Sequence, residues 1–255
     1  MAKGALRSLP AILHAVTLLP MVNHSRDGLN LIFDADDTLW DSNIHFLEAQ
    51  GDFVETMYRA GVAGEAEVHA SIRRHELRII EDVGYGRRPY VMALHRVAAE
   101  LAPEVYHGQV RGEVERIGER LLNRDCELLP GVEPTLRELA GRHRLLLFTK
   151  GQPDEQMRKL DRSGLRPLFS RIGIPIEKEP ATYRLLMAQA QLDPARTVMI
   201  GNSPRSDINP AIRAGLRAAV YIPHPHTWEL EHEEVDDAQG RVLTLPIFPH
   251  LLQIF

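Results

Sequence analysis

The 255-residue sequence predicts an α/β fold, in which a parallel sheet carries helices on both faces and a separate helical segment is inserted into it. Three observations lead to this prediction. Leu31, Ile32 and Phe33 form a short apolar run of the kind found in strands buried on both faces. Residues 44–124 show helical periodicity and no strand pattern. From residue 128 onward, apolar strand patterns alternate with helical ones, as they do in parallel sheets.

The composition is that of an ordinary globular protein, with 44% hydrophobic and 25% charged residues. The formal net charge of -5 and the lack of a basic stripe give no reason to expect a nucleic-acid partner. Cys126 is the single cysteine, which excludes an internal disulfide and suits a reducing cytoplasm. No apolar run approaches the roughly 20 residues that a membrane span needs. We therefore expect a cytoplasmic protein without a membrane partner, and the sequence leaves the oligomeric state open.

Residues 1–28 are expected to form an extension that is poorly ordered or packed at the periphery. Lys3 and Arg7 precede the apolar stretch 9–22, which gives this region the outline of a signal peptide. Two prolines and a histidine interrupt the apolar stretch, however, and no small-residue cleavage site follows it. The sequence thus favours an extension over a signal peptide.

The inserted segment is predicted to hold about four helices packed as a small bundle. Apolar side chains stand at positions 90, 94, 97 and 101, and the same spacing recurs at positions 110, 114, 117 and 121. Each run gives its helix one apolar stripe. Glycines and prolines between the runs mark the breaks between helices.

After the insert, strands and helices alternate in a regular order. We expect strands at residues 145–148, 171–176, 197–200 and 218–222, and helices at residues 134–143, 153–163, 180–191 and 209–215. Prolines near the helix starts and Gly164 and Gly215 near the ends support these bounds, and Asn209 stands where it can cap the last helix. In open parallel sheets of this kind, ligands bind at the carboxyl ends of the strands.

The first strand is followed at once by Asp34, Asp36, Asp37 and Thr38. Three carboxylates in four residues at the end of a buried strand repel one another and lose hydration. A divalent cation would offset this cost, because hard cations take oxygen ligands. A simple turn is the alternative, since Asp is common where strands stop. The local sequence leaves both interpretations open.

The pattern Asp34-x-Asp36-x-Thr38 after an apolar strand resembles motif one of the haloacid dehalogenase superfamily of phosphohydrolases. Three further segments resemble the other motifs of that family, in the same order along the chain. They are the strand 145–148 ending in Thr149, Lys178 before a predicted helix, and the segment 198–207 with Asn202 and Asp207. The resemblance spans roughly residues 29–225. It implies a Rossmann-like core formed by residues 29–43 and 128–255, and a helical cap at residues 44–127.

The resemblance implies a magnesium-dependent phosphatase acting on a small phosphomonoester. Asp34 would be the nucleophile that forms an aspartyl-phosphate, and Asp36 the acid–base. Asp34, the backbone carbonyl of Asp36, Asn202 and Asp207 would hold Mg²⁺. Asn202 departs from the family pattern, which most often has an aspartate there, so one negative charge is missing from the metal site.

The phosphate would be held by a second group of residues. Thr149 and the amides of Lys150 and Gly151 precede a predicted helix start, where anions bind. Lys178 would offset the charge of Asp34 and of the phosphoryl group.

The alternatives to a phosphatase come from the same superfamily and from outside it. Phosphomutases (phosphotransferases) also keep both motif-one aspartates, whereas dehalogenases lack the second, which is present here as Asp36. A phosphoacceptor receiver domain would lack the long helical insert. A non-catalytic binding protein with the same fold is supported by Asn202 alone. The substrate cannot be read, because its determinants lie in the insert and the loops.

Two C-terminal stretches complete the sequence. His224, His226 and His232 give residues 223–242 the outline of a metal cluster, but the acidic residues between them favour a solvated loop or helix. Residues 242–255 are apolar and are expected to dock on the core.

Overall fold

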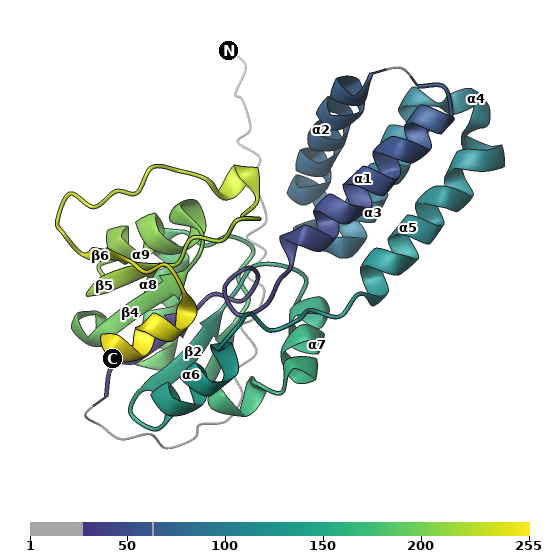
Figure 1. Ribbon diagram of the computed structural model, residues 1–255. Helices are drawn as coiled ribbons and strands as arrows, with labels where there is room; N and C mark the ends of the chain where they lie inside the picture. The colour runs from purple at the N-terminus through teal and green to yellow at the C-terminus, as the bar shows by residue number, and fades with distance from the viewer. Residues whose placement is uncertain (1–27, 63) are drawn as a thin grey trace, which may run out of the picture.

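The computed structural model describes residues 28–62 and 64–255 of the chain. The expectation of a terminal extension at residues 1–28 lies, except for Gly28, outside these residues. The described part consists of a sheet with helices packed on it and a separate group of helices to one side (Figure 1). Among the described helices, none combines the length and the apolar character required to cross a bilayer.

The sheet has six parallel strands in the order β3-β2-β1-β4-β5-β6. The strands are β1 (Asn30–Phe33), β2 (Arg144–Phe148), β3 (Arg171–Gly173), β4 (Thr197–Gly201), β5 (Ala218–Tyr221) and β6 (Val242–Thr244). The strand expected at residues 171–176 ends at Gly173, because Pro175 has no N–H to continue the ladder. The strand order reverses at β1, where the chain leaves β2 and β3 on one side and continues with β4 on the other. This reversal creates a crevice at the carboxyl ends of β1 and β4.

Side chains of the central strand alternate between two cores, one on each face of the sheet. Leu31 and Phe33 pack against α6 (Val132–Ala140) and α7 (Pro153–Ser163). The terminal 3-10 helix η6 (Phe248–Gln253) joins the same core, as expected for a docked carboxyl-terminal stretch.

Ile32 points to the opposite face, where α8 (Pro180–Ala190) and α9 (Asn209–Arg213) cover the sheet. Helices on both faces confirm the predicted α/β class. The helical turn before α9 begins earlier than expected, as the π-helix η4 (Pro204–Ile208). Ser203 caps it by accepting from the Ser206 amide at 2.9 Å, so the expectation that Asn209 is the cap is wrong.

The helical segment has a hydrophobic core of its own, built from the predicted apolar stripes. It comprises α1 (Asn43–Arg59), α2 (Glu65–Val83), α3 (Arg87–Leu101), the short α4 (Pro103–Val105), the π-helix η1 (Tyr106–Val110) and α5 (Arg111–Asn123). Four of these are long helices, which matches the number expected. They stand apart from the sheet layer in Figure 1.

The two chain segments that connect the helical segment to the sheet run side by side. The Asp41 amide donates to the Glu127 carbonyl at 3.0 Å, and the Leu129 amide donates to the Leu39 carbonyl at 2.9 Å. Trp40 is fully buried between these bonds. The turn before it places Asp37 at a φ of 59°, in the left-handed region that Asp tolerates better than most residues.

Candidate active site

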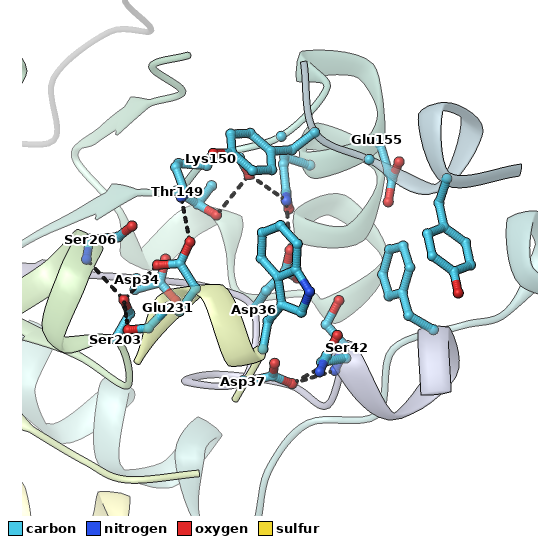
Figure 2. A pocket seen from close by; sticks show the side chains of 18 of the residues that line it. Asp34, Asp36, Asp37, Ser42, Thr149, Lys150, Glu155, Ser203, Ser206 and Glu231 are labelled. Carbon is cyan, nitrogen blue, oxygen red and sulfur yellow. Dashed lines mark hydrogen bonds and ion pairs between the residues drawn. The ribbon is translucent and has the colours of Figure 1, made fainter. Parts of the chain in front are cut away.

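A cavity of about 190 Å³ lies at the carboxyl ends of the central strands, with α1, α2 and α3 of the helical segment forming part of its wall (Figure 2). All eight residues predicted from the sequence line it. They are Asp34, Asp36, Thr149, Lys150, Gly151, Lys178, Asn202 and Asp207. They follow four different strands, so the parallel sheet is what brings them together.

Lys178 holds two carboxylates at the base of the cavity. Its Nζ contacts Asp34 Oδ1 and lies 2.7 Å from Asp207 Oδ1, and all three side chains are buried. Burial raises the pKa of Asp34 to about 7, and the charge of Asp207 adds to this rise while Lys178 opposes it. Burial alone would lower the pKa of Lys178, but the two carboxylates outweigh that effect and raise it. Lys178 is therefore a fixed cation next to the proposed nucleophile.

The segment after β4 is organised by short contacts around Asn202 and Asp207. The Ser203 amide donates to Asp207 Oδ2 at 3.0 Å, and Thr38 Oγ1 donates to Asn202 Oδ1 at 3.1 Å. Gly201 makes room for the aspartate, since a Cβ there would lie 2.3 Å from Asp207 Oδ2. The glycine is thus required by the position of the carboxylate.

These residues fit a hard divalent cation. Asp34, Asp207, Asn202 and the carbonyl of Asp36 supply only oxygen donors, which is the set that Mg²⁺ prefers. The two buried carboxylates share the single ammonium of Lys178, so one negative charge at the base of the cavity stays without compensation. Asn202 Oδ1 accepts one hydrogen bond and keeps its second lone pair.

Asp36 is engaged by three donors. Trp40 Nε1 lies 2.7 Å and Lys159 Nζ 2.9 Å from its Oδ1, and Gln156 Nε2 lies 2.8 Å from its Oδ2. Burial alone would raise the pKa of Asp36, but Lys159 and the other donors outweigh it and lower the pKa to about 2. In this arrangement Asp36 is an ionised acceptor.

Lys159 is a site residue that the sequence did not predict, and it belongs to a longer chain of charged groups. Its Nζ lies 3.4 Å from Glu155 Oε1, and Glu155 in turn accepts from the Arg87 amide at 3.0 Å. All three side chains are buried. Since Arg87 is the first residue of α3, this chain connects Asp36 to the helical segment. The signal in the sequence was slight: Glu155 and Lys159 are one turn apart on the helix that follows Gly151.

The loop after β2 is suited to an anion. The backbone N–H groups of Lys150 and Gly151 donate to no acceptor within the described residues. Gly151 has a φ of 124°, and a Cβ there would lie 2.7 Å from Gln156 Nε2, so this turn needs glycine. Two unused amides beside buried Thr149, ahead of α7, form a set of donors for phosphate oxygens.

Residues 223–242 are only partly the solvated segment that was expected. Glu231, in the 3-10 helix η5 (Glu229–Glu231), is largely buried and lies between Lys150 Nζ at 2.7 Å and Ser203 Oγ at 2.6 Å (Figure 2). These two donors hold the pKa of Glu231 at about 2 although burial raises it. Trp228 also lines the cavity and packs edge-on against Tyr85. The expectation was wrong here because Lys150, distant in sequence, compensates the charge.

The three histidines of this segment do not converge on one point. His224 instead lies between Asp41, with Nε2 to Oδ1 at 3.2 Å, and Asp37, with Nδ1 to Oδ1 at 3.8 Å. One ligand atom from each of these residues falls within 4.8 Å of the others. Asp37 Oδ1 already accepts from the amides of Ser42 at 2.9 Å and Asn43 at 3.0 Å, which gives this carboxylate a structural task.

The helical segment contributes one carboxylate to the wall. Glu76 of α2 is partly buried and makes no hydrogen bond or ion pair with any residue that the structure describes. Burial raises its pKa to about 7, and the charge of Glu229 adds to the rise.

We expect Glu76→Gln to stabilise the protein by about 1–3 kcal/mol at pH 8. The folded-state pKa of about 7 exceeds the ordinary value of 4.5, so the unfolded chain releases this proton first as the pH rises. The wild type therefore loses stability between pH 4.5 and 7, and the variant does not. Urea unfolding at a series of pH values measures the difference, which should vanish below pH 4.5. Glu81→Gln, at an exposed position of the same helix, should follow the wild type. Identical curves for Glu76→Gln and wild type would contradict the expectation.

Comparisons with known proteins agree on one family. The family model described as haloacid dehalogenase-like hydrolase matches residues 30–215. A phosphoserine phosphatase of Thermus thermophilus is 34% identical over 97 residues, which cover 36% of this chain and 39% of that protein. A glyceraldehyde 3-phosphate phosphatase of Methanopyrus kandleri is 25% identical over 214 residues, covering 81% of this chain and 89% of that protein. The crystal structure of a haloacid dehalogenase-like family hydrolase from Xanthomonas campestris superposes with a TM-score of 0.76 at 27% identity, over 93% of this chain and 96% of that one.

Proposed function

The chain belongs to the haloacid dehalogenase-like hydrolases, and on this basis we propose that it is a magnesium-dependent phosphatase that hydrolyses a small phosphomonoester through an aspartyl-phosphate. The observation that carries the proposal is the buried group formed by Lys178, Asp34 and Asp207, beside the unused amides of Lys150 and Gly151. The two relatives named above, both called phosphatases, support it. The single cysteine favours the cytoplasm as its location.

Asp34 is the proposed nucleophile. Its carboxylate attacks phosphorus, and the bond from phosphorus to the alcohol oxygen of the substrate breaks. Burial raises the pKa of Asp34 to about 7, and Lys178 opposes this rise by favouring the ionised form of the nucleophile. Thr149 and the two amides orient the phosphoryl oxygens. Bound Mg²⁺ supplies positive charge that reduces the repulsion between the carboxylate and the phosphate.

Asp36 is the proposed acid–base. It protonates the departing alcohol oxygen and then takes a proton from the water that attacks the aspartyl-phosphate. This attack breaks the bond between phosphorus and the Asp34 oxygen, which releases inorganic phosphate and restores the Asp34 carboxylate. The ion pair with Lys159 lowers the pKa of Asp36 to about 2, so Asp36 has to leave Lys159 before it can act as the acid. We propose that residues 44–127 are a mobile cap. Closure of this cap would move Arg87, and this movement would be passed to Lys159 through the contacts that Glu155 makes with both residues.

Phosphate release from a broad set of phosphomonoesters tests this function. We expect the purified protein to release inorganic phosphate in MgCl2. In EDTA the rate should be at least about 100-fold lower, because a negative charge at the base of the cavity then stays uncompensated. Turnover without a sugar-phosphate acceptor separates hydrolysis from the phosphomutase alternative. No release from any ester would favour a non-catalytic binding protein and would overturn the proposal.

A further inference from the structure

Each lysine in the cavity wall is already matched by two carboxylates. Lys178 contacts Asp34 and Asp207. Lys159 contacts Asp36 and Glu155, at 2.9 and 3.4 Å.

Lys150 completes this set, with Glu231 at 2.7 Å and Glu177 at 3.6 Å from its Nζ. Among the described residues that line the cavity, no cation is left for a second anionic group on a substrate. The phosphate group of the substrate would be bound by the amides of the β2–α7 loop, next to the base of the cavity.

Glu76 is the opposite case, a wall carboxylate without a cation. It makes neither an ion pair nor a hydrogen bond inside the described part of the chain. Burial raises its pKa to about 7, so the environment of this carboxyl in the free protein disfavours its charged form. A cation placed beside it would favour the ionised carboxylate and offset part of the cost of burying that charge.

Tyr90, on α3, adds a second unused polar group. The residue is 4% exposed, and its buried hydroxyl has no hydrogen-bond partner within the described structure. Burial, with the nearby charge of Glu76, raises the pKa of Tyr90 above its ordinary value. Its oxygen can therefore accept a hydrogen bond from a ligand, as can the Glu76 carboxylate.

The wall around these two groups is apolar. Phe46 packs edge-on against Tyr90 with ring centroids 5.2 Å apart, and Leu47, Ile80 and Pro89 line the same cavity. Such a wall suits methylene groups, and its aromatic rings favour a nearby cation.

We propose that the substrate is a phosphomonoester of a short alkyl alcohol that carries a protonated amine, with the amine bound by Glu76 and Tyr90. The inference rests on the proposed function, because the phosphate defines one end of the ligand. It assigns the wall contributed by the helical segment to the amine end.

The test uses a series of ω-aminoalkyl phosphates with two to five carbons. Each is paired with the alkyl phosphate in which a methyl group replaces the ammonium, so that O-phosphoethanolamine is compared with propyl phosphate. Phosphoglycolate supplies an anionic comparison. We expect at least one amine to exceed its methyl partner by about 10- to 100-fold in kcat/KM, as a charged hydrogen bond allows. Phosphoglycolate should be the poorest of the short esters.

Variants assign this preference to the two residues. Glu76→Gln should reduce the amine-to-methyl ratio of kcat/KM by about tenfold or more, mainly through KM, and Tyr90→Phe should reduce it by a smaller factor. Glu81→Gln removes the same charge from an exposed position on α2 and should leave the ratio unchanged. A wild-type ratio near one, or a ratio that Glu76→Gln does not alter, would overturn the inference.

A binding measurement separates this inference from the proposed function. The corresponding ω-amino alcohols, titrated by calorimetry or NMR, should bind wild type more tightly than Glu76→Gln, whether or not any ester is hydrolysed. Glu76-dependent binding without turnover would support the amine site and refute the proposed phosphatase activity. Turnover of alkyl phosphates without an amine preference would leave the phosphatase standing and remove the amine site.

Discussion

Asp34→Asn is expected to lower the rate of phosphate release by at least about 1,000-fold, because an amide cannot form the covalent phosphoryl intermediate. The fold should persist, since Lys178 keeps its contact with Asp207 at 2.7 Å and Asn fills the same volume. Inorganic phosphate release in MgCl2 measures the effect, and circular dichroism checks the fold.

Asp161→Asn is the matched control, at an exposed position of α7 where the carboxylate pairs with Arg166. This variant should retain wild-type activity. Equal rates for Asp34→Asn and the wild type would refute the nucleophile assignment, whatever the activity of the control.

Lys178→Met is expected to remove activity and to destabilise the fold by about 3–5 kcal/mol in EDTA at pH 8. Without the ammonium, Asp34 and Asp207 face each other as buried carboxylates with nothing to balance their charges. Burial raises the pKa of both groups. The loss of stability should therefore shrink as the pH falls and these carboxyls take up protons. Urea unfolding followed by tryptophan fluorescence measures the loss of stability and its dependence on pH, and phosphate release measures the loss of activity.

The same variant reports on the cation. Mg²⁺ should restore more stability to Lys178→Met than to the wild type, because it supplies the charge that the lysine no longer provides. Lys178→Arg, which keeps a positive charge, should lose less stability than the methionine variant. If Lys178→Met unfolds like the wild type, then the lysine is not what compensates the two carboxylates.

The fold was largely predictable because its signals are local. The strand β1 and the helices on both faces follow from apolar runs and spacings of a few residues. The stripes of the helical segment are buried as expected. The eight predicted residues come together in one cavity because parallel strands present their carboxyl ends at one edge.

What could not be predicted depends on pairs of residues that are far apart in the sequence. Asp36 and Lys159 lie 123 residues apart, and Lys150 and Glu231 lie 81 apart. No local pattern marks such a pairing, and an acidic stretch that is mostly exposed gives no sign that Glu231 is buried. Glu76 was missed for the same reason, since only the packed helices show that it faces the cavity.

The paired connections described above have a consequence for how this protein can be altered. Backbone hydrogen bonds join the two connecting segments directly. They link Leu39 and Asp41, on the way into the helical segment, to Leu129 and Glu127, on the way back to the sheet. The helical unit is thus joined to the sheet at one place, by two connecting segments that lie side by side. The cores on the two faces of the sheet are formed without its helices. A unit attached in this way can be exchanged for another of different size without rebuilding the sheet, as long as the contact between the Arg87 amide and Glu155 is kept or replaced.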